Sequence, residues 1–357
     1  MSHTISVIVP LHQGAPFIEA TLASVAAQTR APRDIVVIDD HSRDDGARRA
    51  ARFPGVEVHV ARGHGPAAAR QQALELARGT RIAFLDQDDI WAADHLAGLS
   101  TALDRHPEAA FVWAPMRSWR GDPARLPTSL SGTLAEQWID PWTTLPSCAV
   151  STPSCVMVER DRLTDIGGWS PAVEVADLHT YLLLACRGPA LRTARISVAY
   201  RQSPDSNSRR LRRDPAPLLA AQVRTVQSAL RWREARHGPC PAAHARLQVM
   251  ARLPDLLQAD PVVLAAFCAT LRHSDCDPTA VVSHLQWLRP DTRDPALVLD
   301  QLARLQQLGP VDPHLLRALA RGVQATALCR GGWYRPRLWP ILAGSLLERT
   351  QARWRPN

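Results

Sequence analysis

Short apolar runs alternate with amphipathic stretches through the first 110 residues, and this alternation restricts the fold more than any other feature of the sequence. The apolar runs predict strands at residues 5–10, 34–39, 56–60 and 80–86. The stretches between them predict helices at residues 15–29, 44–53 and 66–77. Strands and helices that alternate at this spacing form right-handed βαβ units, so we expect a mainly parallel sheet.

The rest of the chain shows an irregular stretch, a second α/β segment and a helical region. Residues 115–154 are rich in Pro, Ser, Thr and Trp and predict a loop or insertion. A strand leading into a helix is predicted at residues 155–163, and a further helix at residues 175–186. From about residue 215 the patterns are helical. The predicted architecture is therefore an α/β domain over residues 1–210 and an all-helical domain over residues 211–357.

Charge is distributed unevenly between these two regions. Residues 1–200 hold 19 arginines against 22 acidic residues, whereas residues 201–357 hold 23 against 12. The basic second region has three uses that the sequence leaves open: solvated arginines, peripheral contact with anionic lipid at the inner face of a membrane, and a protein partner. Its basic residues are not interleaved with aromatics and form no known binding motif, which argues against nucleic acid.

The sequence shows neither a membrane span nor a zinc-binding pattern. No apolar run approaches the ~18 residues that a spanning helix needs. The apolar N-terminus is too short for a signal peptide and is expected to be the first strand. None of the seven cysteines forms a CxxC pair, which indicates reduced thiols. We therefore expect a cytoplasmic protein.

Acidic side chains gather where two of the predicted strands end. Asp39 and Asp40 follow the second strand, and Asp86, Asp88 and Asp89 follow the fourth. The carboxyl ends of parallel strands share one edge of a sheet, and ligands bind there. Like charges this close repel each other, so either a solvated turn or a bound cation must offset the cost.

Five motifs in order carry a resemblance to a known family. They read "SVIVP", "VVIDDHSRD", "GPAAARQQALELARGTRIAFLDQDDIW", "DIGGW" and "ADLHTYLLLA". In this order and spacing the chain resembles the family 2 glycosyltransferases, whose catalytic domain has the GT-A fold, a Rossmann-like and mainly parallel mixed sheet. The resemblance covers roughly residues 4–210, and residues 211–357 resemble nothing we can name.

The resemblance implies a divalent cation at the acidic run after the fourth strand. Asp86, Gln87 and Asp88 match the family's Asp-x-Asp motif, which implies that Asp88 ligates Mg²⁺ or Mn²⁺. Asp86 then faces the ribose or reaches the metal through water. Such ions prefer carboxylate ligands and share substrate phosphates, so one or two carboxylates suffice. We expect Asp89 to cap the following helix.

The resemblance also implies where the nucleotide lies. The family places its nucleoside contacts at the backbone around Pro10 and at Asp39 and Asp40, and Arg70 near the base. From the residues alone, the two acids also suit a capped turn, and Arg70 suits an ordinary surface position. Gln71 replaces the asparagine that is usual in this motif.

Asp177 aligns with the family's general base, which implies direct displacement with inversion at the anomeric carbon. From the residues alone, a carboxylate that interacts with a helix dipole is the other interpretation. Three positions depart from the family pattern. Ala176 replaces a glutamate, His179 replaces a second acid, and Ser203 stands where a metal-binding histidine often follows Tyr-Arg. With serine at position 203, a metal held by Asp88 and the diphosphate alone would be bound more weakly.

The predicted function is non-processive, inverting transfer of a sugar from a nucleotide-diphosphate sugar, with UDP as the first choice, to a hydroxyl acceptor. The acceptor is a glycan, a lipid-linked glycan, a protein or a small molecule, and bacterial cell-surface glycan assembly is one setting. The alternative is a catalytically silent sugar-nucleotide-binding or scaffold protein. Lysine is absent, since all 42 basic residues are arginine, which excludes a Walker-A loop and argues against a sugar nucleotidyltransferase. No GxGxxG turn supports a dinucleotide-dependent oxidoreductase.

Overall fold

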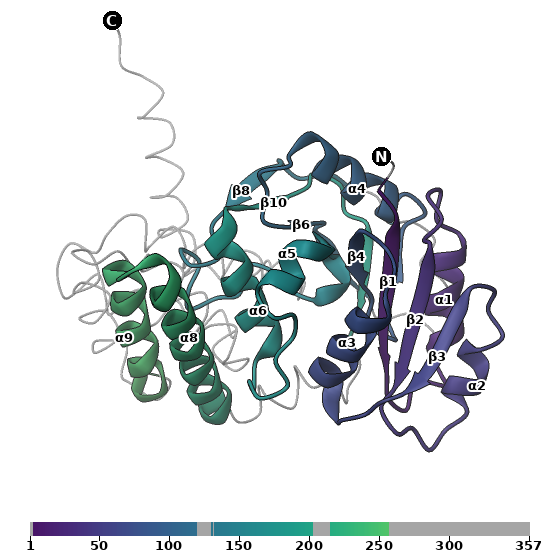
Figure 1. Cartoon of the computed structure of the whole chain (residues 1–357), viewed down its shortest axis with the longest axis horizontal. Helices are drawn as coiled ribbons and strands as arrows, with labels where there is room; N and C mark the ends of the chain where they lie inside the picture. Colours follow the sequence, from purple (N-terminus) through teal and green to yellow (C-terminus); the bar gives the residue numbers. More distant parts are fainter. Residues whose placement is uncertain (1–2, 120–129, 131, 203–214, 257–357) are drawn as a thin grey trace, which may run out of the picture. The chain divides into compact units, whose positions relative to one another are not determined.

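The structure is a computed structural model that describes residues 3–119, 130, 132–202 and 215–256 (Figure 1). The chain divides into two compact units. The described residues of the first unit are 3–144, apart from 120–129 and 131, together with 148–202 and 221–240. Those of the second unit are 145–147, 215–220 and 241–256. The boundary after residue 210 that the sequence suggests stays a prediction.

The first unit is built on an eight-stranded mixed sheet with the order β3-β2-β1-β4-β9-β6-β10-β8. Its first four strands in sequence, with β6 and β10, run in parallel pairs, whereas β9 and β8 pair antiparallel with their neighbours. The strands are β1 (Ile5–Leu11), β2 (Asp34–Asp39), β3 (Val56–Val60), β4 (Arg81–Phe84), β6 (Val112–Trp113), β8 (Gln137–Ile139), β9 (Val156–Glu159) and β10 (Ala190–Arg192).

The central strands form because their apolar runs are covered on both faces. Every apolar residue of β1 is at most 1% exposed, and β2 and β4 are buried along most of their length. A strand buried on both faces reads as a continuous apolar run, which is why β1, β2 and β4 were predictable. The alternating β3 lies at the sheet edge and is only partly buried.

Helices follow the strands as the βαβ pattern requires. α3 (Gly65–Leu76) packs against β1 and β2, and α4 (His95–Arg105) packs against β6 and β9. Gly65 adopts a φ of +85°, a conformation that glycine tolerates where the chain enters the helix. Pro66 follows it, and proline is favoured at the start of a helix because the N–H that it lacks would have no partner there. The remaining helices of this segment are α1 (Ile18–Ala26), α2 (Gly46–Ala50), α5 (Arg160–Asp165) and α6 (Ala176–Leu184), with 3₁₀ turns at Pro153–Cys155 and Ala185–Arg187.

A second, three-stranded sheet has the order β5-β11-β7. Its strands are β5 (Ile90–Trp91), β7 (Met116–Trp119) and β11 (Val198–Arg201). The prediction of a wholly irregular stretch at residues 115–154 was therefore wrong, because β7 and β8 lie within it. Both strands are short and half-exposed, so neither produces a strong apolar pattern.

Beyond residue 214 the described chain is helical, as predicted, with α8 (Pro215–His237) and α9 (Pro241–Leu256). Residues 221–240, which include most of α8, belong to the first unit. Two of its polar side chains contact the residues just before α6. Arg224 pairs with both carboxylate oxygens of Glu174 at 2.8 Å, and Thr225 Oγ1 accepts from the Val175 N–H at 3.4 Å. None of the described helices combines the length and apolarity that crossing a membrane requires.

Candidate functional site

The candidate site lies where β1, β2 and β4 end at one edge of the sheet. The register pairs Leu11 with Asp39 and Ile8 with Phe84, so the residues just after β4 follow beside the last residues of β1. The segments that follow them carry Asp40 and Asp86. The sequence-based expectation that these acids share one edge is confirmed by this register.

Asp86 is paired with Arg70 of α3. The guanidinium Nη2 donates to Asp86 Oδ1, and Thr152 Oγ1 donates to Oδ2 at 3.2 Å. Arg70 also lies over the ring of Trp169, 4.8 Å from its centroid, and is only 7% exposed. The interpretation of Arg70 as a surface arginine is therefore wrong. Its Nε is buried and has no hydrogen-bond partner among the described residues.

Gln87 ties the acidic segment to the end of β1. Its Oε1 accepts from the His12 N–H at 2.6 Å, and its Nε2 donates to the His12 carbonyl at 2.8 Å. Gly14 leaves room for this arrangement, since a Cβ there would lie 2.6 Å from Gln87 Oε1. The middle residue of Asp-Gln-Asp thus fixes the position of the acids on either side.

Asp88 is a partly buried carboxylate to which no side chain in the described ranges donates a hydrogen bond. Burial raises the pKa of Asp88 to about 6, and the charge of Asp86 adds to the shift, while Arg201 opposes it. A bound cation would stabilise the charged form of Asp88. It would replace the solvation lost on burial and balance the two negative charges of Asp86 and Asp88. Two neighbouring carboxylates are also the donor set that Mg²⁺ and Mn²⁺ prefer, so these residues fit the implied metal.

Asp89 does not cap the following helix, so that prediction was wrong. The residue is fully buried and accepts from Ser154 Oγ at 2.6 Å, from the Arg201 N–H at 2.9 Å and from Thr152 Oγ1 at 3.3 Å. Asp94 occupies the N-terminal boundary of α4 instead. Asp89 therefore connects the acidic segment with β11 of the small sheet. Burial raises the pKa of its carboxyl well above the usual range, and the charges of Asp88 and Asp86 raise it further.

Asp177 lies in the first turn of α6, where its Oδ1 accepts from the Leu178 N–H at 2.8 Å. Burial raises its pKa; the nearby Asp86 also raises the pKa, whereas Arg70 lowers it. These influences place Asp177 in the electrostatic neighbourhood of the Arg70–Asp86 pair. The structure thus brings Arg70, Asp86 and Asp177 together, although they lie far apart in the sequence.

Two uncharged groups belong to the same neighbourhood. Burial and the charge of Asp177 raise the pKa of Cys148 to about 12, so this thiol stays protonated. The pKa of Tyr181 is also raised, first by burial and then by Asp177, and its hydroxyl has no hydrogen-bond partner within the described part of the chain. Sequence reasoning did not single out either residue.

The candidate nucleoside contacts lie at the ends of β1 and β2. Pro10 pairs with Ile38 across these strands. Asp39 Oδ1 accepts from the Ser42 N–H at 3.1 Å, and Asp40 Oδ2 accepts from the Gly65 N–H at 2.7 Å. The bond to Ser42 fits the turn interpretation for Asp39, whereas Asp40 binds the start of α3 instead.

The residues that depart from the family pattern differ in their surroundings in the structure. His179 packs against α8, where its Nε2 lies 3.3 Å from Ser228 Oγ, and burial lowers its pKa. It therefore contributes to packing and belongs to no cluster of metal ligands found among the described residues. Gln71 has a structural partner, since its Oε1 accepts from the Trp169 N–H at 2.8 Å. Ser203 lies outside the described residues.

Sequence reasoning also missed the side chains that support the acids. Ser154 Oγ accepts from the Asp86 N–H at 2.9 Å while it donates to Asp89. Arg201 Nε donates to the Asp88 carbonyl at 2.9 Å, and its guanidinium lies over the ring of Trp119, 4.1 Å from the centroid. Trp169 is the last residue of the motif "DIGGW", but the sequence alone indicated no role for it.

Comparison with known proteins agrees with this geometry. Residues 6–152 match the model of the family described as glycosyl transferase family 2. The chain is 36% identical over 97 residues to UDP-Glc:alpha-D-GlcNAc-diphosphoundecaprenol beta-1,3-glucosyltransferase WfgD of Escherichia coli. It is 34% identical over 125 residues to the putative teichuronic acid biosynthesis glycosyltransferase TuaG of Bacillus subtilis. These matches cover 26% and 33% of this chain, and only 38% and 50% of the two relatives' own lengths.

Two solved structures share the fold across most of the chain. S. aureus TarS 1–349, crystallised with UDP, aligns with a TM-score of 0.52 and 17% identity over 93% of each chain. The mannosyltransferase PcManGT from Pyrobaculum calidifontis, solved with GDP-Man and Mn²⁺, aligns with a TM-score of 0.51 and 22% identity over 92% of this chain and 87% of its own. At these identities the likeness shows the fold alone.

Proposed function

We propose that the protein is an inverting, non-processive glycosyltransferase, on the premise that residues 6–152 match glycosyl transferase family 2 and that the chain has the GT-A fold. It moves a sugar from a nucleotide-diphosphate sugar to a hydroxyl acceptor. The observation that carries the proposal is the position of Asp177 beside the Arg70–Asp86 pair, with a raised pKa.

In this reaction the acceptor oxygen forms a bond to the anomeric carbon while the bond from that carbon to the diphosphate oxygen breaks. The bonding electrons leave with the nucleoside diphosphate, and the acceptor's proton passes to Asp177. One displacement inverts the anomeric configuration. A raised pKa favours Asp177 in this role, because a less solvated carboxylate is a stronger base. A positioned base contributes about 10²–10⁴-fold to the rate.

The leaving diphosphate requires positive charge. Mg²⁺ or Mn²⁺ held by Asp88 and Asp86 would supply it as a Lewis acid. Arg70 holds Asp86 in place through its hydrogen bond to Oδ1. Gln87 and Ser154 fix the backbone of this segment, so the acids are arranged before a substrate arrives.

The backbone at Pro10 and the side chains of Asp39 and Asp40 hold the nucleoside in this proposal. UDP is the first choice, since the names of a relative and of a solved neighbour contain UDP. The same relative's name describes a lipid-linked sugar acceptor, and the acceptor class proposed here is a glycan under assembly for the cell surface. We place the reaction on the cytoplasmic side. The predicted membrane contact through the basic C-terminal region lies mostly outside the described residues.

Calorimetric titration of UDP tests the proposal. The full chain is titrated with Mn²⁺ and with chelator, beside Asp88→Ala and the exposed control Asp165→Ala. We expect metal-dependent binding that Asp88→Ala abolishes and Asp165→Ala retains. Binding that ignores the metal would contradict the role of Asp88. Failure of UDP, GDP and TDP to bind would favour the scaffold alternative.

The catalytic step has its own test. Asp177→Asn keeps the size of the side chain and removes the base, so we expect UDP to bind unchanged while transfer from a UDP-sugar to an acceptor falls at least about 100-fold. Unimpaired transfer by this variant would exclude Asp177 as the base.

A further inference from the structure

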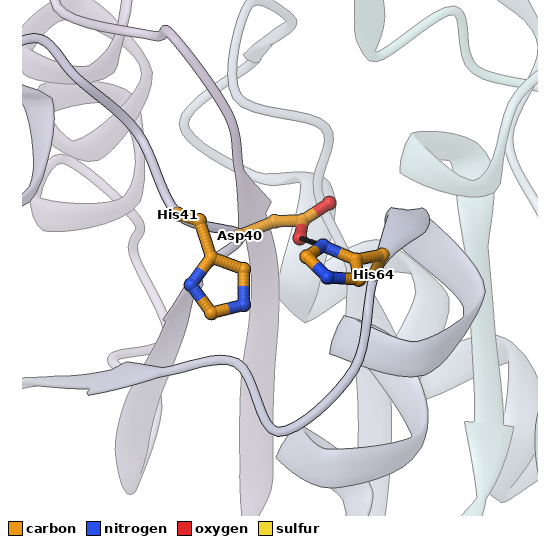
Figure 2. A group of neighbouring side chains, drawn as sticks. All are labelled: Asp40, His41 and His64. Carbon is orange, nitrogen blue, oxygen red and sulfur yellow. Dashed lines mark ion pairs between the residues drawn. The ribbon is translucent and has the colours of Figure 1, made fainter.

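A second group of ligand-bearing side chains lies near the end of β2, separate from the Asp86–Asp88 pair. It consists of Asp40, His41 and His64 (Figure 2). One ligand atom from each residue lies within 4.8 Å of the others. Asp40 and His41 directly follow β2, and His64 directly precedes α3, so strand and helix ends bring the three together.

The carboxylate of Asp40 is held in one orientation with one oxygen unused. Its Oδ2 accepts from the Gly65 N–H at 2.7 Å. Its Oδ1 is buried and has no hydrogen-bond partner in the described ranges, although His64 Nδ1 approaches it to 3.5 Å. A buried oxygen without a partner carries a desolvation cost, which a bound cation would remove.

The rings of the two histidines lie close to each other and are tilted by 46°. Their ring centroids are 4.7 Å apart, and Figure 2 shows the His64 ring turned toward the Asp40 carboxylate. His41 adopts a left-handed backbone, with φ at +55°. The His64 side chain is 85% exposed and therefore free to rotate.

We propose that Asp40, His41 and His64 form a site for a nitrogen-preferring divalent cation such as Zn²⁺. In a tetrahedral site, Zn–N and Zn–O bonds of about 2.0–2.2 Å set two ligand atoms about 3.4 Å apart, so side-chain rotation would have to bring together atoms that now lie within 4.8 Å of one another. Two imidazoles select Zn²⁺ over Mg²⁺ and Mn²⁺, whereas the Asp86–Asp88 pair has the opposite preference. The chain thus offers two divalent sites of different chemistry at one edge of its sheet.

A bound Zn²⁺ would oppose nucleotide binding. This consequence rests on the proposed function, in which Asp40 contacts the nucleoside. An ion that engages Oδ1 of Asp40 removes the oxygen that the capping bond leaves for a ligand. Zn²⁺ would therefore act as an inhibitor that competes with the nucleotide.

Titration of the full chain with Zn²⁺ in excess Mg²⁺ tests the site, because Mg²⁺ occupies the carboxylate pair. The variants are His41→Asn, which tolerates the left-handed backbone, and His64→Ala. His3→Ala, an exposed histidine at the opposite end of β1, is the control. We expect each site variant to lose at least about tenfold in Zn²⁺ affinity and the control to match the wild type. Co²⁺ bound in place of Zn²⁺ should show the visible absorption of nitrogen ligation, lost in both site variants.

Unchanged Zn²⁺ affinity in His41→Asn and His64→Ala would overturn the proposal. So would Zn²⁺ binding that Asp88→Ala abolishes and the histidine variants retain, since the ion would then lie at the acidic pair. The competition with UDP is measured separately, with and without Zn²⁺, in wild type and in His64→Ala. A chain that binds Zn²⁺ but never UDP would contradict the proposed function and leave the cation site standing.

Discussion

Gln87 and His12 are joined by two hydrogen bonds that run in opposite directions, one into the side-chain Oε1 of Gln87 and one out of its Nε2. This pairing resembles the exchange between two strands, but here a side chain supplies one partner. It joins the end of β1 to the segment that carries Asp86 and Asp88. The nucleoside and metal parts of the candidate site are therefore mechanically connected.

Replacing Gln87 with Ala should loosen this connection. Two partly solvated hydrogen bonds are lost, so we expect the free energy of unfolding to fall by about 1–2 kcal/mol. UDP affinity should fall as well, because the ends of β1 and β4 are no longer aligned. Urea unfolding and UDP calorimetry measure the two effects, with the exposed Gln137→Ala as control. A normal UDP affinity in Gln87→Ala would show that the connection does not serve the ligand.

Arg70 and Asp86 should shift the acid limb of the pH–rate profile in opposite directions. Arg70 lowers the pKa of Asp177 and Asp86 raises it. A base must be deprotonated to act, so Arg70→Met should move the acid limb to higher pH and Asp86→Asn to lower pH. The measurement is kcat/KM against pH, with Arg62→Met, an exposed arginine, as control. Shifts of the same sign in both variants would refute the placement of Asp177 beside this pair.

Asp88 should destabilise the folded chain when no metal is present. Its folded pKa of about 6 lies above the ordinary 3.8, so the unfolded chain releases this proton first as the pH rises. Stability is therefore lost between about pH 4 and pH 6 and stays reduced above that window. In chelator at pH 7.5, we expect Asp88→Asn to be more stable than wild type by about 1–3 kcal/mol.

Thermal unfolding in chelator at several pH values checks this prediction. The stability difference between Asp88→Asn and wild type should become smaller as the pH falls from 7.5 to 5. The exposed control Asp165→Asn should show no such trend. Saturating Mn²⁺ should reverse the order, because only the wild type retains the ligand. An Asp88→Asn variant less stable than wild type in chelator would contradict the electrostatic account.

Gly168 should be far less tolerant of a side chain than its neighbour Gly167. Both have positive φ, at +74° and +87°, so alanine at either position should cost about 1–2 kcal/mol in backbone strain. A Cβ at Gly168 would in addition lie 2.2 Å from Gln71 Oε1, whereas one at Gly167 meets nothing within 4 Å. The comparison of Gly168→Ala with Gly167→Ala therefore measures the contacts of the new Cβ with Gln71 and, at 3.0 Å, with Leu74 Cδ2.

Urea unfolding measures this difference, and the double variant Gly168→Ala/Gln71→Ala tests its cause. Removing the glutamine side chain removes the collision, so the two substitutions should cost less together than their sum. Additive costs would show that Gln71 moves aside freely and does not fix Trp169.

The sequence predicted those parts of the fold that rest on local pattern. β1, β2 and β4 are apolar because both faces are covered, and α3 begins with Gly-Pro, so each leaves a readable signal. The small sheet left none, since β5 has two residues and β7 is half-exposed along its length. Its existence depends on pairing with β11, about 80 to 110 residues away in sequence.

The same distinction between local pattern and distant contacts applies to the candidate site. The acids were predictable because they follow strands and match a family motif. Their supports were not, because Ser154 reaches Asp89 across 65 residues and Gln71 reaches Trp169 across 98. The helix cap assigned to Asp89 failed for the same reason: β5 intervenes before α4 begins, and tertiary partners claim the carboxylate.

The attachment of α8 to the first unit bears on how such chains exchange modules in evolution. Arg224 and Thr225 contact the two residues that precede α6, so they support the turn that presents Asp177. Both lie well beyond residue 152, where the match to the family ends. A recombination event that replaced everything after the last strand would remove these supports with the old module. Exchange at a point after residue 240 would keep them, and a new C-terminal module could then be acquired without disturbing the acids.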